Sequence, residues 1–208
     1  MQRFIRSNDF AGIVAIWQAC FGDDESYVRF FWDNCFPMCK GLGREEDGKL
    51  AAMLFMLPGG LIAPREPPHP CGAPLLGGEL AGAEYIYAVA TLPAYQKRGY
   101  AAQLTQWAAE IAKSEGKAAL CLSPATQALF AYYSKLGFVQ AFVKQNTGHG
   151  KFTWPPHMLN YLEKEASLVG RAPMESDEPN GMLLALDERA TNWLAQTQGK
   201  AYLEYNLE

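Results

Sequence analysis

The sequence contains no hydrophobic run long enough to cross a membrane and no block of basic residues. Its 208 residues carry a formal net charge of −4, and nowhere do more than two Lys or Arg residues stand together. A membrane helix needs about 20 consecutive apolar residues, and a nucleic-acid-binding surface normally shows a basic stripe that offsets phosphate charge. The sequence therefore predicts a protein with neither a membrane nor a nucleic acid as its partner.

Disulfide and metal-binding patterns are also missing. The five cysteines form an odd and irregularly spaced set: Cys20, Cys35, Cys39, Cys71 and Cys121. Cys35 and Cys39 are four residues apart, but no second ligand pair accompanies them, so we expect free thiols and no metal site. The first residues contain no apolar leader core. Together these features predict a protein of the reducing cytoplasm.

The sequence is rich in the residues that build a packed core. Hydrophobic residues make up 49% of the chain, aromatic residues 12% and charged residues 19%. This composition is typical of an ordinary globular protein, and the length suits one core. We therefore expect a single domain over residues 1–208.

The order of the predicted elements favours a mixed α/β sheet. Residue periodicity and turn residues predict, in order, a strand at 2–6, a helix capped by Asn8 or Asp9, and a second helix opened by Asp23 and Asp24. There follow a hairpin around Asp47–Gly48, a strand at 83–93, a helix at 100–116, a strand at 117–123, a helix at 125–136 and a strand at 138–144. The alternation of strands and helices over 83–144 implies a right-handed crossover and a parallel strand pair. The hairpin adds antiparallel strands.

The remaining segments extend this pattern. A proline-rich loop is predicted at 64–74, a helix at 155–169, a strand at 181–187, a helix at 188–196 and a terminal strand at 201–207. Because the terminal strand alternates apolar and polar residues, we expect it to join the main sheet rather than a second domain.

The turn Gln96-Lys97-Arg98-Gly99-Tyr100-Ala101 is the most informative segment for function. It lies between a predicted strand and a predicted helix, where unpaired main-chain N–H groups and a partial positive charge favour an anion such as a diphosphate. Gly99 and the small Ala101 allow close approach of the main chain. The two common phosphate-loop patterns, GxxxxGK[ST] and GxGxxG, are absent. A basic turn with no ligand is the alternative interpretation.

The flanking residues make the pattern specific. The run EYIYAVATLPAYQKRGYAAQL resembles motif A of the GNAT acetyltransferases, and ALFAYYSKLGF further along resembles their motif B. Within the family the chain looks most similar to the Eis-related branch over residues 1–145. The resemblance implies the GNAT fold, with a mixed, mostly antiparallel sheet that splays after the fourth strand and is flanked by helices. Residues 146–208 carry no motif and are interpreted as a C-terminal extension that completes the sheet.

The resemblance also implies how acetyl-CoA would bind. The pantetheine arm would pair with the main chain of Ala88, Val89 and Ala90. The residues expected to surround the diphosphate are Gln96, Lys97, Arg98, Gly99, Tyr100, Ala101 and Ala102. Thr126, before the second motif's helix, is also placed among the cofactor-binding residues. No metal is implied, because the thioester is already activated.

Two side chains are implied to act in catalysis. Tyr133 occupies the family's tyrosine position and would protonate the departing thiolate; the alternative is a packing residue. Glu84 is the candidate base that would receive the amine's proton, because an ammonium cannot attack a thioester; the alternative is a solvated carboxylate at the start of a strand. Four further carboxylates are candidates for the acceptor side: Asp23, Asp24, Glu25 and Glu79.

The predicted function is transfer of an acetyl group from acetyl-CoA to a primary amine of a small molecule or peptide, by direct attack in a ternary complex. Two alternatives stay open, transfer of a different acyl group and a non-catalytic CoA-binding module. The resemblance also allows a homodimer through open sheet edges. The sequence identifies neither the acceptor amine nor the role of residues 146–208.

Overall fold

The structure is a computed structural model that describes residues 1–61, 80–144, 181–197 and 201–203. The chain divides into two compact units, which are described separately. The first unit comprises residues 1–58 and 85–111, and the second comprises residues 59–84 and 112–208. Strands β3 and β4 and helix α3 each contain residues of both units.

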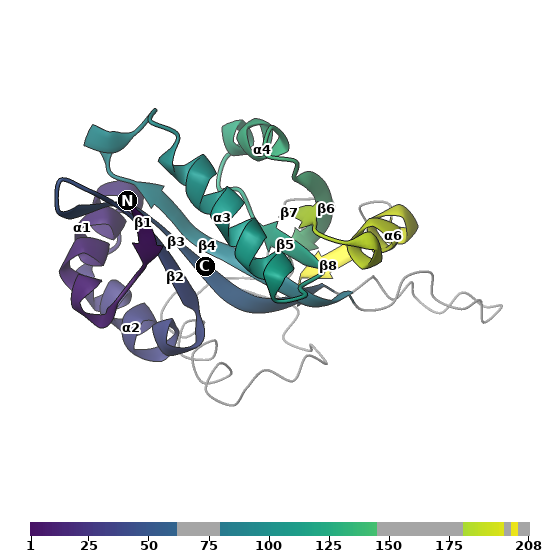
Figure 1. The fold of residues 1–208 in the computed structure, drawn as a ribbon, viewed down its shortest axis with the longest axis horizontal. Coiled ribbons are helices and arrows are strands. Elements are labelled where there is room, and N and C mark those ends of the chain that lie inside the picture. Colours follow the sequence, from purple (N-terminus) through teal and green to yellow (C-terminus); the bar gives the residue numbers. More distant parts are fainter. Residues whose placement is uncertain (62–79, 145–180, 198–200, 204–208) are drawn as a thin grey trace. The chain divides into compact units, whose positions relative to one another are not determined.

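The described strands are β1 (Gln2–Phe4), β2 (Lys40–Glu46), β3 (Lys49–Leu61), β4 (Leu80–Thr91), β5 (Ala119–Leu122), β6 (Val139–Lys144), β7 (Gly181–Ala185) and β8 (Ala201–Leu203). Hydrogen bonds join them in the order β1-β2-β3-β4-β5-β7-β6-β8 (Figure 1). The pairs β1–β2, β2–β3, β5–β7 and β6–β7 are antiparallel, whereas β4–β5 and β6–β8 are parallel. The predicted mixed α/β sheet is confirmed.

In the first unit, helix α1 (Phe10–Phe21) ends where the sequence predicts, and helix α2 (Glu25–Asn34) begins where the sequence predicts. Gly22 adopts a left-handed φ of 79° and closes α1, a conformation that costs glycine little. Asp24 then caps α2, because its carboxylate accepts a hydrogen bond from the Tyr27 amide.

The hairpin between β2 and β3 turns at Asp47 and Gly48. Both residues have positive φ, 51° and 71°, as a two-residue turn that follows the twist of the strands requires. The predicted hairpin is confirmed.

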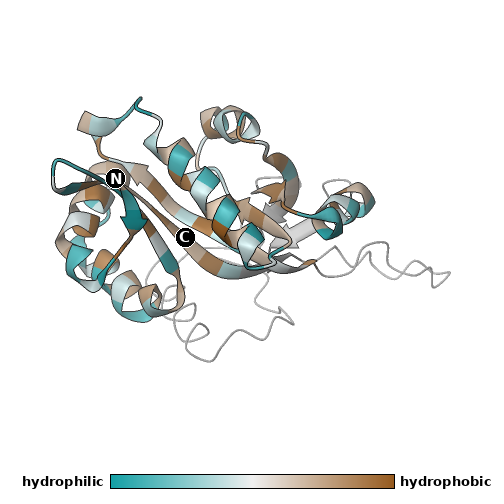
Figure 2. Cartoon of the chain, in the orientation of Figure 1, coloured by the Kyte–Doolittle hydropathy of each residue, from teal (hydrophilic) through white to brown (hydrophobic). Residues whose placement is uncertain are grey.

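Helices cover both faces of the first unit's strands. On one face, Phe55 of β3 contacts Trp17 of α1 and Phe31 of α2, with ring centroids 6.0 and 5.0 Å apart. On the other face, Phe4 of β1 packs 5.1 Å from Trp107 of α3 (Tyr100–Ser114). Figure 2 shows hydrophilic and hydrophobic residues alternating around α3, as expected for a helix that buries one side.

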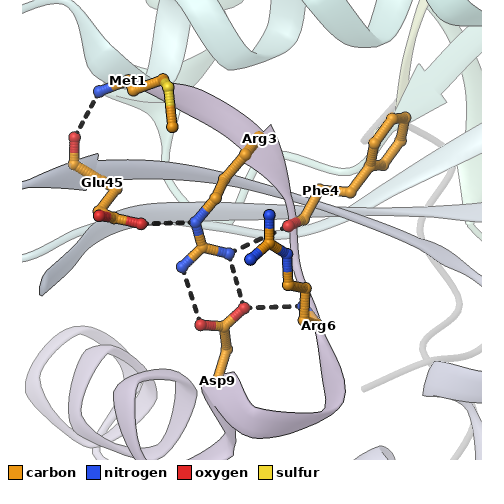
Figure 3. Close-up of polar contacts among 6 residues, drawn as sticks. All are labelled: Met1, Arg3, Phe4, Arg6, Asp9 and Glu45. Carbon is orange, nitrogen blue, oxygen red and sulfur yellow. Dashed lines mark hydrogen bonds and ion pairs between the residues drawn. The ribbon is translucent and has the colours of Figure 1, made fainter. Parts of the chain in front are cut away.

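A network of charged groups fixes the chain's start to this unit (Figure 3). The Arg3 guanidinium pairs with Asp9 at 2.7 Å and with Glu45 at 2.6 Å, and the Asp9 carboxylate also accepts from the Arg6 amide. The side chains of Arg3 and Asp9 are only 14% and 13% exposed. Of the two expected caps of α1, Asn8 and Asp9, it is Asp9 that occupies the position, but its carboxylate binds Arg3 and Arg6 and makes no capping bond to the helix.

The second unit is built on β5, whose four residues are all buried. β7 pairs with β5 and β6, and Gly181 is needed there because a Cβ would lie 2.0 Å from the Phe142 ring. Helices α4 (Gln127–Ser134) and α6 (Glu188–Thr197) complete the described part of this unit. β8 covers residues 201–203 of the predicted terminal strand and pairs with β6, whereas residues 204–207 lie outside the described residues.

Several predicted boundaries differ from the structure. β4 begins at Leu80, three residues before the predicted start, so Glu84 lies inside the strand. Helix α4 is shorter than predicted and closes at Lys135, while Gly137, the predicted cap, has a φ of 92°. The predicted loop at 64–74 and helix at 155–169, together with Cys71 and Glu79, lie outside the described residues.

The splay of the sheet after β4 and the single-domain organisation of residues 1–208 stay predictions. In the described parts of the chain, no helix combines the length and the apolar character needed to span a bilayer. The four described cysteines, Cys20, Cys35, Cys39 and Cys121, are free thiols.

Candidate functional site

The turn between β4 and α3 exposes main-chain donors. Lys97 and Gly99 both have left-handed φ angles, 62° and 77°. The first helical bond runs from the Gln103 amide to the Gly99 carbonyl at 3.0 Å. Among the described residues, none accepts a hydrogen bond from the amides of residues 97–102. The N-terminus of α3 is therefore ready to bind an anion.

The polar side chains of this turn fold back and leave the amides open. The Gln96 side-chain amide donates to the Thr91 carbonyl at 3.2 Å. The Arg98 guanidinium donates to the Ala94 carbonyl at 3.3 Å and lies 5.1 Å from the centre of the Tyr95 ring. Lys97 is exposed and pairs with no carboxylate among the described residues. The main chain is thus the principal donor here, with Lys97 as an available cation.

β4 is irregular where the sequence predicts binding of the pantetheine arm. Ala88 has a φ of 49° inside a strand, a conformation that costs a non-glycine residue about 1–2 kcal/mol. Such an irregularity turns main-chain groups out of the regular strand ladder. Ala88 and Val89 are partly exposed, whereas Ala90 is buried. The main-chain groups around Ala88 can therefore bind a partner other than a regular neighbouring strand.

Tyr133 lies in the second unit, near the end of α4. It is 6% exposed, and its ring contacts Tyr132 and Phe138 with centroids 5.0 and 5.7 Å away. Burial raises the pKa of the Tyr133 phenol well above its usual value, and the neighbouring Tyr132 adds to this effect. No described residue hydrogen-bonds its hydroxyl. Tyr133 therefore holds its proton at neutral pH.

Glu84 lies in the second unit and is paired with a cation. It is 3% exposed, and its carboxylate is 2.6 Å from the Lys117 ammonium. The Cys121 thiol also approaches the Glu84 carbonyl at 3.6 Å. The Glu84 carboxylate is therefore already engaged in an ion pair inside the protein. The alternative of a solvated carboxylate is wrong, because Glu84 is buried and ion-paired.

Thr126 is the N-cap residue of α4, also in the second unit. It is exposed and extended, and its side chain makes no capping hydrogen bond. A neighbouring pocket of about 510 Å³ is lined by Gln127, Phe130, Ala131, Ser134 and residues 137–140. None of the predicted site residues lines this pocket.

The described acceptor-side carboxylates each have a structural partner. Asp23 accepts from the Trp17 indole at 2.8 Å, Asp24 caps α2, and Glu25 lies 3.4 Å from Arg29. The Ser26 hydroxyl and then the Tyr27 amide hold the pKa of Asp24 below its usual value.

Among the aromatic residues beside these carboxylates, Phe31 belongs to the core at 0% exposure. The sequence does not predict one pair of tyrosines near this segment. The Tyr27 and Tyr87 hydroxyls lie 2.9 Å apart, and Tyr87 directly precedes Ala88. These two residues are 60 positions apart, so no local pattern could have paired them.

The family model of the acetyltransferase (GNAT) family matches residues 10–138. The chain belongs to the GNAT acetyltransferase family. The match includes the irregular part of β4, the open turn and Tyr133, so the expected GNAT fold is confirmed. Comparison with curated proteins gives no match.

Three solved structures illustrate how the GNAT fold recurs. YhbS from Escherichia coli, solved with CoA, has a TM-score of 0.60 and 16% identity and covers 98% of this chain and 88% of its own. The ribosomal-protein-S18-alanine N-acetyltransferase from Escherichia coli has a TM-score of 0.55 and 17% identity, with coverages of 90% and 94%. A GNAT acetyltransferase from Brucella melitensis, solved with acetyl-CoA, has a TM-score of 0.50 and 21% identity, with coverages of 67% and 82%. At these identities the likeness concerns the fold.

Proposed function

We propose that the protein is an N-acetyltransferase that moves an acetyl group from acetyl-CoA to a primary amine. The observation that carries the proposal is the set of open amides at residues 97–102, at the N-terminus of a helix, within a chain of the GNAT family. An anion-binding turn fits the diphosphate of CoA. The solved complexes of YhbS and the Brucella protein with CoA and acetyl-CoA lend support by analogy.

The chain's main-chain groups would do most of the binding. The amides of residues 97–102 would surround the diphosphate, with Lys97 and Arg98 adding positive charge. The Gln96 amide was also expected there, but it donates to the Pro93 carbonyl at 3.3 Å. Ala88, Val89 and Ala90 would pair with the pantetheine arm, and the positive φ of Ala88 supports this role because strain in a strand needs a compensating use. Thr126 is also proposed to bind the cofactor, on the basis of the sequence alone.

Bound acetyl-CoA supplies an activated acyl group. In the proposed reaction the amine nitrogen attacks the thioester carbonyl, the C–S bond breaks, and Tyr133 gives its phenolic proton to the departing sulfur. The raised pKa of Tyr133 favours this role, because the group must be protonated before it can donate. The proton released by the amine needs another acceptor.

Glu84 stays the sequence-based proposal for that acceptor, but its ion pair with Lys117 weighs against it. A water molecule, or another group near the bound amine, could receive the proton instead. The likeness to the Eis-related branch, a cytoplasmic location and a homodimer also stay proposals.

An amine panel with a thiol-release readout tests the function. Purified protein is given acetyl-CoA with small amines, polyamines and peptides, and free CoA thiol is measured. Amine-dependent release supports the proposal, and the same assay with propionyl-CoA and succinyl-CoA tests transfer of another acyl group. Thermal unfolding with CoA runs in parallel, since a ligand at 100 times its Kd stabilises a protein by about 2.7 kcal/mol. Stabilisation without thiol release from any donor would favour the non-catalytic module, and no stabilisation at all would overturn both.

A further inference from the structure

Four side chains from β2 and α3 form a polar and aromatic cluster against the first turn of α3. The Arg44 guanidinium lies 4.7 Å from the centre of the Tyr100 ring and donates to the Glu46 carboxylate at 3.2 and 3.3 Å. It also approaches the Gln103 side-chain oxygen at 3.5 Å. The Tyr100 hydroxyl faces the Glu46 carboxylate closely enough to lower the pKa of that carboxyl. All four residues belong to the first unit.

The geometry of β2 explains why these side chains meet α3. Arg44 and Glu46 are two residues apart and share a face of the strand, whereas Glu45 points to the other face and binds Arg3. The register of β2 against β3 shifts between Arg44 and Glu45. The extra residue, Ala51, lies on β3, so β2 keeps its alternation through Glu46. The end of β2 thus presents one arginine–glutamate pair to the helix that follows the phosphate-binding turn.

Tyr100 connects this cluster to the turn. It follows Gly99 directly, is the first residue of α3, and is 7% exposed. Its main-chain amide is one of the open donors, while its ring lies under the Arg44 guanidinium. The Tyr100 hydroxyl is the main cause that keeps the pKa of Glu46 below its usual value, with Arg44 also contributing, so Glu46 is ionised at neutral pH. Gln103 touches the same turn, since a Cβ on Gly99 would lie 3.7 Å from its side-chain nitrogen.

We propose that Arg44 and Glu46 are positioning residues that hold Tyr100 in place and so preset the amides of the turn for the diphosphate of CoA. The inference rests on the proposed function. It assigns a role in anion binding to a negatively charged residue, Glu46, which holds Arg44 against the Tyr100 ring. A simple electrostatic view gives the opposite expectation, because a carboxylate near an anion site repels the anion.

Replacing Glu46 by Gln separates the two views by the sign of the effect. If Glu46 only contributes charge, Glu46→Gln tightens CoA binding. If Glu46 positions Tyr100 by way of Arg44, the variant weakens the charge-assisted bonds from Arg44 and CoA binds about 3- to 10-fold more weakly. Arg44→Lys adds a second test, because lysine keeps the charge but cannot make the paired bonds to Glu46 or lie flat on the ring. Positioning predicts that Lys fails to restore binding at residue 44.

The experiment measures the Kd of CoA by titration calorimetry for the parent chain, Glu46→Gln, Arg44→Lys, Arg44→Gln and Tyr100→Phe. Glu110→Gln is the matched control, since it removes one negative charge from the exposed side of the same helix, away from the turn. We expect weaker binding in all four cluster variants, an unchanged Kd in the control, and a higher KM for acetyl-CoA with kcat preserved. Thermal unfolding verifies that each variant is folded at the assay temperature.

The outcomes distinguish this inference from the function on which it rests. If the parent chain fails to bind CoA, the proposed function fails. If the parent binds and Glu46→Gln binds as tightly or more tightly, only the positioning role is overturned. Equal affinity of Arg44→Lys and the parent would also overturn it, because charge alone would then suffice.

Discussion

The turn at residues 96–102 and the buried Glu84 were both expected to be functional, and the protein treats their polar groups in opposite ways. The amides of residues 97–102 have no acceptor among the described residues, and the side chains of Gln96 and Arg98 fold away from them. Glu84 is enclosed and held by Lys117 at 2.6 Å. Because buried polar groups are normally satisfied, groups that the fold leaves open are the better candidates for ligand binding. The Tyr133 hydroxyl likewise has no hydrogen-bond partner among the described residues. The Arg3 guanidinium, like the Glu84 carboxylate, is held by ion pairs.

The largest effect is expected at Tyr133. Tyr133→Phe keeps the buried ring and removes the proton donor, so kcat should fall about 100-fold with little change in the Kd of acetyl-CoA. The matched control is Tyr132→Phe, which removes the adjacent hydroxyl and should retain turnover. Steady-state kinetics with the best amine of the panel measures both. Equal turnover of Tyr133→Phe and the parent would remove Tyr133 from the mechanism.

The next effect is expected at Gly99. Gly99→Val places a branched side chain at a φ of 77°, where the backbone becomes strained or changes conformation, so the open amides lose their arrangement. We expect the Kd of CoA to rise about 10-fold, roughly 1.4 kcal/mol.

Gly22→Val is the control for Gly99→Val, because Gly22 has nearly the same φ, 79°, and an added Cβ meets nothing within 4 Å. Both variants should lose similar stability, but only Gly99→Val should lose CoA affinity. A similar loss of affinity in both would show that the effect is general.

A change at Glu84 tests whether its ion pair with Lys117 is structural. If the ion pair is structural, Glu84→Gln should cost about 1–2 kcal/mol of unfolding free energy, moderated because Lys117 is 29% exposed. Adding Lys117→Gln should restore part of that loss, and the pH profile of kcat should match that of the parent. Chemical denaturation and pH-dependent kinetics measure these effects. A rate that falls most at low pH in Glu84→Gln would instead identify Glu84 as the base.

The smallest effect is expected at Asp9. Its pKa is lowered, mainly by the hydrogen bond from Arg3, so its stabilising contribution is present above the ordinary carboxyl pKa near 3.9 and is lost as the pH falls through the lower folded value. Asp9→Asn should cost about 1 kcal/mol at neutral pH and flatten the acid limb of the stability curve. The Kd of CoA should stay the same. An unchanged acid limb would contradict the role given to the Arg3 network.

Local patterns predicted most of this architecture. Gly22, Asp24 and the Asp47–Gly48 turn fix element boundaries through their own backbone preferences, and the structure follows them. The turn at residues 96–102 was also predicted, because its chemistry depends on neighbouring residues in the sequence.

Contacts between distant residues could not be predicted. The ion pair of Glu84 with Lys117, the hydroxyl pair of Tyr27 with Tyr87 and the Arg44 cluster each join segments that only the fold brings together. The left-handed Ala88 was hidden for a different reason: alanine does not favour that conformation, so its sequence gives no signal.

The most direct test of the central claim is a titration of the isotope-labelled protein with CoA, followed by amide proton–nitrogen NMR. The account predicts that the largest saturable shifts occur at the amides of Gly99, Tyr100 and Ala101, and that Gly99→Val abolishes them. Tight binding of CoA that leaves these amides unchanged would contradict the account.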